Sequence, residues 1–418
     1  MKYALLFLSI VSMAFAANYH GCTLAPDNQH GWIACLDTVL ILHTSNGGVS
    51  WESQDAPLGS LTFFDVTCVD ELNAWTCGIE GEILHTKDGG LNWYQQYTGL
   101  AKYATRIEFI DHTYGWAAAG DGFVGVTTDG GEVWEQIVTS FYGAEFYGIW
   151  FVDQLEGWIV AGWPDSIDTG QGIIARSTDG GLHWDTLYIS HSYEDFFDVY
   201  FFDQLNGIVV GGDEIDYSPI ILKTTDGGLT LNPITAPPNS YYLRAVDFVG
   251  NEGWAVGRFG TIIHSTDGGN TWTFQNSPAT LTLFDVDFSD NLHGLACGYD
   301  MILRTTDGGQ NWQYVGVQEN HDSKPKITTL DIYPNPFRKM TNISFSTGHS
   351  AKGIELKIYD CMGRLVKQFL LPTSYSLLPT IATWDGTDDD GGVLPSGIYF
   401  AQLITPEHQI TEKIILLR

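Results

Sequence analysis

The chain has 418 residues, with 50 Asp and Glu against 19 Lys and Arg, and a formal net charge of −31. This surplus of carboxylates argues against binding to nucleic acid and to anionic membrane surfaces, because both kinds of binding rest on Lys and Arg. The 44% hydrophobic content is enough for a sizeable core. The length corresponds to two or three domains.

The N-terminal segment has the features of an export signal. Lys2 supplies a positive start, Ala4 to Val11 is an apolar run, and Ala14-Phe15-Ala16 has the small-residue spacing of a cleavage site. We predict a signal peptide over residues 1–16. No later stretch reaches the roughly 18 apolar residues of a membrane helix, so we expect an exported protein with no transmembrane segment.

The cysteines are too few for a disulfide scaffold in an exported chain of this size. There are 6, and we assign no pairing. Cys68 and Cys77 fall on adjoining predicted strands, which leaves a cross-strand bridge as one alternative. Buried free thiols are the other.

An octet motif dominates the chain, with Thr86 to Trp93 (TKDGGLNW) as a complete copy. Two degenerate copies carry Asn46 in place of Asp and Leu231 in place of Trp, and they complete a set of seven. The third residues of the octets, separated by 42, 41, 50, 47, 41 and 40 residues, are Asn46, Asp88, Asp129, Asp179, Asp226, Asp267 and Asp307.

Short alternating stretches around each octet predict four β-strands per unit of about 40 residues, which is typical of a β-propeller. In the second unit we expect strands over 63–69, 74–78, 82–86 and 92–97. No single blade can bury both faces of its sheet, so the blades must pack face to face and the ring must close. We therefore predict an all-β fold with a seven-bladed β-propeller over residues 17–317.

The octets resemble Asp-box (BNR-like) repeats, and with the Gly-Trp element before each one they resemble the propellers of the photosystem II assembly and stability factor family. That resemblance implies the fold. An Asp before Gly-Gly at a hairpin bend accepts backbone N–H bonds while the glycines take positive φ. We assign the seven octet residues a structural role, because a reaction centre needs one asymmetric constellation.

Function is expected where the repeat symmetry breaks, at the end of the ring opposite the octets. Two enlarged loops, 163–170 and 212–217, belong to this end, together with aromatic connections between blades and non-repeating polar residues at the starts of the inner strands. Aromatic platforms with polar anchors suit sugars or extended peptides. The candidate ligand-binding residues are Asp65, Arg106, Trp163, Tyr193, Asp198, Tyr242, Arg244 and Asp285.

A carbohydrate-active glycoside hydrolase is the enzymatic alternative. Asp-box propellers also occur in sialidases and some endoglucanases, and glycosidic cleavage usually needs two carboxyl groups across the scissile bond. Asp65, Asp198 and Asp285 are the carboxylates available for such a pair. We assign no catalytic residue, no metal site and no cofactor, since the sequence has no Gly-rich phosphate loop, His-Glu-x-x-His or Cys-x-x-Cys motif.

The composition changes after a polar linker, residues 318–326. Residues 327–418 carry 9 acidic and 8 basic residues. About seven alternating segments in this stretch predict a small Ig-like β-sandwich. The tail resembles the type A C-terminal sorting domain of the type IX secretion system through Tyr333, Pro334, Asn335, Pro336, Gly363, Arg364, Gly397, Tyr399 and Lys413.

That resemblance implies passage through the periplasm, recognition by the outer-membrane translocon, and release or attachment at the cell surface. The function predicted from the whole sequence is therefore a secreted or cell-surface binding propeller without catalysis, whose ligand is a glycan, surface polymer or protein. A third alternative is an assembly factor that docks a basic protein partner on its acidic face.

Overall fold

The computed structural model describes residues 18–36, 40–57, 62–100, 102–162, 171–213, 215–315, 327–333, 335–347, 355–360, 362–369, 380–389, 391–404 and 409–417. The predicted signal peptide, the predicted linker, Trp163 with its loop, and Pro334 lie outside these residues. The chain divides into two compact units, Met1–Gln318 and Glu319–Arg418. Each unit is described by itself.

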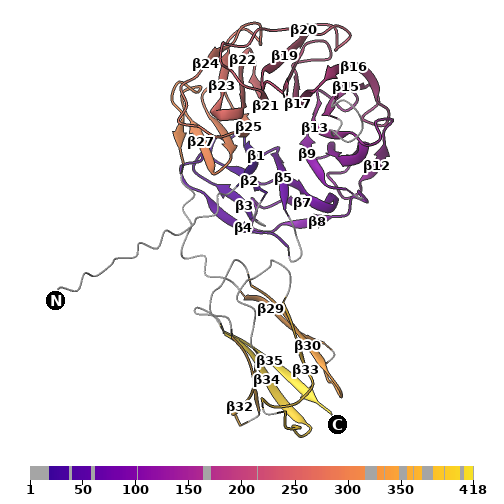
Figure 1. Cartoon of the computed structure of the whole chain (residues 1–418), viewed down its shortest axis with the longest axis vertical. Coiled ribbons are helices and arrows are strands. Elements are labelled where there is room, and N and C mark those ends of the chain that lie inside the picture. The colour runs from indigo at the N-terminus through magenta and orange to yellow at the C-terminus, as the bar shows by residue number, and fades with distance from the viewer. Residues whose placement is uncertain are drawn as a thin grey trace, which may run out of the picture. The chain divides into compact units, whose positions relative to one another are not determined.

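The first unit is a ring of antiparallel sheets arranged around a central axis (Figure 1). Each blade is built from four consecutive strands. Blades one to three are formed by β1 (Tyr19–Leu24), β2 (Gly31–Cys35), β3 (Leu40–Thr44), β4 (Glu52–Asp55), β5 (Phe63–Cys68), β6 (Ala74–Gly78), β7 (Ile83–Thr86), β8 (Tyr94–Gln96), β9 (Ala104–Phe109), β10 (Gly115–Ala119), β11 (Phe123–Thr127) and β12 (Glu135–Val138).

Blades four and five are joined into one eight-stranded sheet by a single parallel pairing of Gln171 with Glu194. Blades four to seven are formed by β13 (Glu145–Phe151), β14 (Gly157–Gly162), β15 (Gln171–Ser177), β16 (Asp185–Ser192), β17 (Glu194–Phe201), β18 (Gly207–Asp213), β19 (Pro219–Thr224), β20 (Asn232–Pro233), β21 (Leu243–Val249), β22 (Glu252–Gly257), β23 (Ile262–Ser265), β24 (Thr273–Phe274), β25 (Leu283–Phe288), β26 (Gly294–Gly298), β27 (Met301–Thr305) and β28 (Gln313–Tyr314). The predicted all-β, seven-bladed propeller is confirmed.

The core lies between neighbouring blades, where aromatic rings of one sheet stack on those of the next. Trp116 of β10 stacks on Phe151 of the following blade with ring centroids 3.6 Å apart, and Trp158 stacks on Phe201 at 3.5 Å. The same second-strand tryptophans donate across the interface, as Trp116 Nε1 does to the carbonyl of Gly180 at 2.8 Å. Burial of these rings is the main stabilising contribution to blade packing.

The ring closes between blade seven and blade one, each made of its own contiguous stretch of chain. The N–H of Cys22 donates to Asp285 at 2.8 Å, and the N–H of Leu24 donates to Asp287 at 2.6 Å. Leu24, Leu295 and Ile302 lie in one buried cluster across this seam. These contacts and an isolated backbone bridge between Asn18 and Tyr299 hold the closure, and the described residues exchange no strand there.

The described cysteines are free thiols. In the β5–β6 pairing, Cys68 lies opposite Ala74 and Cys77 lies opposite Asp65. The alternative of a bridge between Cys68 and Cys77 is wrong, because the register sets the two residues three positions apart along the ladder.

The second unit contains two sheets around one core. One has the order β29 (Ile327–Tyr333), β30 (Thr341–Thr347), β33 (Thr380–Trp384), and the other has the order β32 (Leu365–Phe369), β31 (Glu355–Asp360), β34 (Gly397–Ile404), β35 (Gln409–Leu416). Ile343 and Trp384 of the first sheet pack with Ile358 and Leu403 of the second. This is a two-sheet sandwich, and its Ig-like classification stays a prediction.

Candidate functional site

The seven octets form identical closed turns between the third and fourth strands. In the second octet, Thr86 Oγ1 donates to Asp88 at 2.9 Å and accepts the N–H of Gly90 at 2.8 Å, while Asp88 accepts the N–H of Asn92 at 2.9 Å. Both octet glycines have positive φ in every copy. Each Asp or Asn is thus occupied by its own turn, so the octets offer no distinct reaction centre.

At the opposite end, the first strand of every blade carries a β-bulge at the same position. A bulge leaves one residue out of the ladder and redirects its side chain. We call the seven bulge residues the collar; they are His20, Phe64, Thr105, Tyr147, Phe197, Arg244 and Phe284.

Neighbouring collar side chains contact one another around the axis of the ring. The ring of His20 stacks on Phe284 at 5.0 Å and meets Phe64 edge-on at 5.7 Å. Tyr147 lies 5.4 Å from Phe197, and the guanidinium of Arg244 lies 4.0 Å above Phe197. The collar is therefore largely aromatic, and its chemistry differs from blade to blade.

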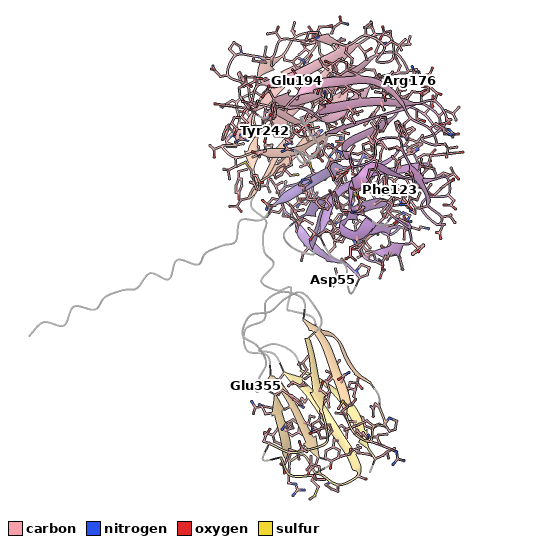
Figure 2. All side chains as sticks on the ribbon, turned by 45° about the vertical axis from the view of Figure 1, so that its right-hand side comes forward. Asp55, Phe123, Arg176, Glu194, Tyr242 and Glu355 are labelled. Carbon is pink, nitrogen blue, oxygen red and sulfur yellow. The ribbon has the colours of Figure 1, made fainter. Side chains whose placement is uncertain are left out.

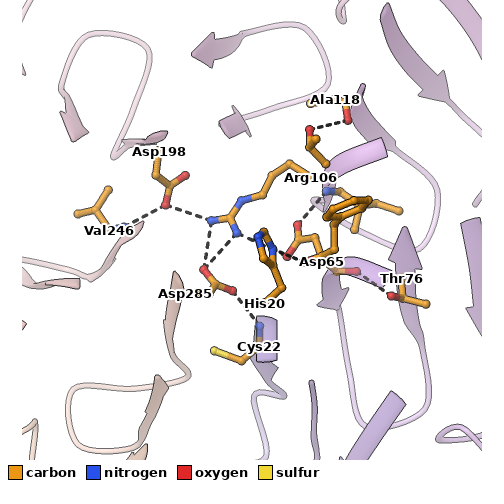
Figure 3. Close-up of polar contacts among 12 residues, drawn as sticks. His20, Cys22, Asp65, Thr76, Arg106, Ala118, Asp198, Val246 and Asp285 are labelled. Atoms are coloured by element: carbon orange, nitrogen blue, oxygen red, sulfur yellow. Dashed lines mark hydrogen bonds and ion pairs between the residues drawn. The ribbon is translucent and has the colours of Figure 1, made fainter. Parts of the chain in front are cut away.

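One residue further along each first strand is a second tier, dominated by Arg106 of β9. Its guanidinium lies 3.1 Å from Asp198 and from Asp285 and 3.5 Å from Asp65 (Figure 3). Asp65, Asp198 and Asp285 are the equivalent residues of blades two, five and seven. In blades one, four and six the equivalents are small: Gly21, Gly148 and Ala245. A Cβ added at Gly21 would lie 2.5 Å from Asp65 Oδ1, so a larger residue does not fit there.

The second-tier carboxylates also join neighbouring blades. Asp65 accepts the N–H of Ile107 in the next blade at 2.9 Å, and Asp198 accepts the N–H of Val246 in the next blade at 2.9 Å. Burial raises the pKa of Asp65 to about 7 and that of Asp198 to about 6, against the opposing effect of Arg106. Burial also lowers the pKa of His20 to about 4, so this imidazole is neutral at physiological pH.

This arrangement argues against the hydrolase alternative. Asp65, Asp198 and Asp285 are 4%, 5% and 5% exposed, and all three bind the same guanidinium. A glycosidase needs two carboxyl groups that face each other across a space for the sugar. Here Arg106 fills that space.

A third tier below it lines a small cavity of about 80 Å³. Glu108, Asp247 and Asp287 belong to this tier, with Trp150 beside them. Burial raises the pKa of Glu108 and of Asp287 well above the ordinary carboxyl range. Among the described residues, no group of three or more His, Cys, Asp or Glu side chains is arranged to hold a metal ion.

Three of the remaining predicted ligand-binding residues, Tyr193, Tyr242 and Arg244, lie at the collar end. Tyr193, in the connection from blade four to blade five, is exposed, whereas Tyr242, labelled in Figure 2, is buried. Arg244 and Tyr242 contact each other, with the guanidinium 5.2 Å from the ring. Trp163 lies outside the described residues.

Sequence reasoning missed six collar residues, which are His20, Phe64, Thr105, Tyr147, Phe197 and Phe284. Phe64, Phe197 and Phe284 directly precede the polar residues that were singled out. An alignment of the inner strands of the repeats would have shown the collar residues, since they occupy one equivalent position in each repeat. The bulge, however, is a property of strand pairing and leaves no local sequence mark.

In the second unit, the motif residues hold the strands together. Asn335 Nδ2 donates to the carbonyl of Lys413 at 2.6 Å, and Asn335 Oδ1 accepts the N–H of Ile415 at 2.9 Å. Arg364 Nε donates to Asp360 at 2.7 Å across the turn that Gly363 forms with positive φ. Tyr399 donates to the carbonyl of Pro395 at 2.7 Å.

Fold and site together define an Asp-box propeller followed by a two-sheet C-terminal unit. The family described as Photosynthesis system II assembly factor YCF48 matches residues 6–100 and 176–276. The family described as Secretion system C-terminal sorting domain matches residues 331–417. Both resemblances found in the sequence are thereby confirmed.

Individual relatives agree with these matches. Photosystem II assembly lipoprotein Ycf48 of Synechococcus sp. (strain CC9902) is 42% identical over 57 residues, which span 13% of this chain and 17% of that protein. A structure of YCF48 bound to D1 peptide aligns with a TM-score of 0.56 and 19% identity, over 71% of this chain and 95% of that one. PorZ, a surface component of the type IX secretion system of Porphyromonas gingivalis, aligns with a TM-score of 0.52 and 16% identity, over 96% of this chain and 59% of that one.

The sorting-domain match indicates export by type IX secretion to the cell surface or the medium. At this identity the structural likenesses show the fold alone. Within the described part of the chain, no helix has the length and apolarity to cross a membrane.

Proposed function

We propose that this protein is a non-catalytic binding scaffold displayed at the cell surface or secreted, and that it binds its ligand at the collar end of the propeller. The observation that carries this proposal is the collar. The octet end presents seven copies of one turn, whereas the collar presents five residue types at seven equivalent positions around the ring axis. A rigid ring with a variable, aromatic mouth is suited to recognition.

The delivery part of the proposal is a route through the periplasm to the outer-membrane translocon, which recognises the C-terminal unit. It is supported by the family match over residues 331–417. In the native host, deletion of residues 331–417 should leave the propeller inside the cell, whereas the full chain reaches the surface or the medium. Equal export of both forms would contradict this route.

The binding part is tested with the full-length mature chain on an array of bacterial surface polysaccharides, plant glycans and peptides. A Phe64→Ala, Phe284→Ala double variant opens the collar beside His20 and should lose the ligands that the wild type retains. The matched control is a Leu91→Ala, Val133→Ala double variant, which removes two exposed apolar side chains at the octet end. Loss of ligands in the control, or none in the collar variant, would place recognition elsewhere.

A further inference from the structure

Lys and Arg are few in the propeller, and four of the eight have no carboxylate partner among the described residues. Residues 18–323 hold 41 acidic residues against 8 Lys and Arg. Lys87, Lys102, Arg106 and Arg176 are each paired with a carboxylate. Among the described residues, neither Arg244 nor Arg258 has a carboxylate within ion-pair distance, although such partners are abundant in the chain.

Arg258 begins the turn η4 (Arg258–Gly260) at the collar end of blade six. Its guanidinium lies 3.8 Å from the centre of the Tyr217 ring and 4.8 Å from that of Phe259. One terminal nitrogen donates to the hydroxyl of Tyr242 at 3.2 Å. Nε of Arg258 is buried and has no hydrogen-bond partner among the described residues.

Arg244, the collar residue of the same blade, is held in a similar way. It stacks over Phe197 at 4.0 Å and lies 5.2 Å from the ring of Tyr242. Its Nε is also buried without a hydrogen-bond partner among the described residues. Tyr242 thus lies against both arginines, so the two guanidinium groups flank one aromatic side chain.

Two of the rings that contact Arg258, Tyr217 and Phe259, are open to solvent, and so is Tyr241 beside Phe259. Tyr217, Tyr241 and Phe259 are 37%, 39% and 50% exposed, and Tyr241 meets Phe259 edge-on at 4.7 Å. Stacked arginines keep their planar donors free for a bidentate anion, since a ring contacts only the face of the guanidinium. The structure therefore combines fixed hydrogen-bond donors for an anion with exposed aromatic rings.

We propose that Arg244 and Arg258, with Tyr217, Tyr241, Tyr242 and Phe259, form a subsite for a carboxylate-bearing sugar, such as a hexuronic acid residue of an extracellular glycan. The guanidinium groups take the carboxylate, and an exposed ring takes the apolar face of the sugar. This inference rests on the proposed function and names the ligand class of the same face. A sugar is favoured over a peptide carboxylate because three exposed rings, Tyr217, Tyr241 and Phe259, lie beside the guanidinium groups.

The test is calorimetric titration of the full-length mature chain with tri-galacturonate and with its methyl ester, which has the same rings without the charge. The acid should bind at least tenfold more tightly than the ester, and the Arg258→Gln and Arg244→Gln variants should each lose at least tenfold in affinity for the acid. Arg304→Gln is the matched control. Arg304 also has a buried, unpartnered Nε among the described residues, but it packs beside the octet glycine Gly48.

Equal binding of acid and ester overturns the carboxylate role, and this arm needs only the wild-type protein. Preference for a peptide with a free C-terminal carboxylate overturns the sugar assignment. If the array finds other ligands that depend on Phe64 and Phe284 while tri-galacturonate does not bind, this inference fails and the proposed function stands. If collar variants change no ligand at all, the proposed function fails as well.

Discussion

Arg106 illustrates how one side chain connects distant parts of the ring. It leaves the inner strand of blade three and contacts carboxylates from blades two, five and seven. The second tier holds three buried acids and one base, and this guanidinium favours the ionised forms of Asp65 and Asp198 against the effect of burial on their pKa. The arginine therefore contributes to stability through what its loss would leave uncompensated.

Arg106→Met should destabilise the propeller by about 3–5 kcal/mol at pH 7.5, the usual effect of removing one partner from a buried ion pair. The loss should shrink at pH 5, because Asp65 and Asp198 then take up protons. Urea unfolding followed by tryptophan fluorescence measures both values. Lys87→Met serves as the control, since the Lys87–Glu132 pair is exposed and such pairs contribute about 1 kcal/mol or less. Similar losses at both pH values would contradict the argument.

Glu108 makes the stability depend on pH. Burial raises its pKa in the folded state, so the folded protein holds a proton that the unfolded chain releases above its ordinary pKa of 4.5. Its contribution to stability is therefore complete at low pH and is lost as the pH rises from about 4.5 toward the folded pKa.

Glu108→Gln removes this loss. The variant should match the wild type at pH 4 and exceed it at pH 8, by about 1.4 kcal/mol for each pKa unit of the shift. Chemical denaturation at the two pH values checks the prediction. Glu132→Gln, at an exposed carboxyl, should show no such difference. A stability gain of equal size at both pH values would rule out titration as the cause.

At the scale of the element, three of the octets also form a socket, a binding site for a glutamine side chain of the blade before them. Gln96 at the end of β8 donates to the carbonyl of Gly130 at 2.9 Å and accepts from Trp134 Nε1 at 3.1 Å. Gln54 and Gln275 make the equivalent contacts with the octets of their following blades. The octet thus closes its own hairpin and fixes the spacing of neighbouring blades.

Gly131→Ala tests this double role. The residue has φ +88°, and an added Cβ would lie 2.0 Å from Gln96 Oε1. We expect a loss of about 2–3 kcal/mol, from about 1–2 for the left-handed backbone and about 1 for a broken hydrogen bond. Gly250→Ala, with φ +63° and open space around its Cβ, should cost only the backbone part. Thermal unfolding of both variants separates the two effects, and equal losses would show that the socket contributes nothing.

The octet turn could be predicted from sequence because its hydrogen bonds are local: Thr86, Asp88 and Gly90 lie within five positions. The propeller followed from the octet spacing. The collar could be found only by superposing the repeats, since the bulge that holds Phe64 and Phe197 forms only when the first and second strands pair. The reach of Arg106 to Asp285 spans 179 positions, so the mouth carboxylates were predicted as ligand anchors whereas the structure holds them in ion pairs.

For the whole ring, stability depends on the seam because every blade needs two neighbours. Blade seven meets blade one through Asp285, Asp287 and the cluster that contains Leu295. With no exchanged strand between the described residues of this interface, hydrogen bonds to Asp285 and Asp287 and side-chain packing oppose its opening. We therefore expect that weakening the seam loosens all seven blades together. The C-terminal unit should be unaffected.

Leu295→Ala, which leaves a cavity at a residue 1% exposed, should destabilise the propeller by about 2–5 kcal/mol. Hydrogen exchange with mass spectrometry should show faster exchange in all blades, including β14 in the interior of blade four, because loss of one interface exposes the next. Protection of β34 and β35 should stay at the wild-type level, since their core is formed by the two sheets of the C-terminal unit. Faster exchange confined to β1, β25 and β26 would instead mean that the blades open one at a time.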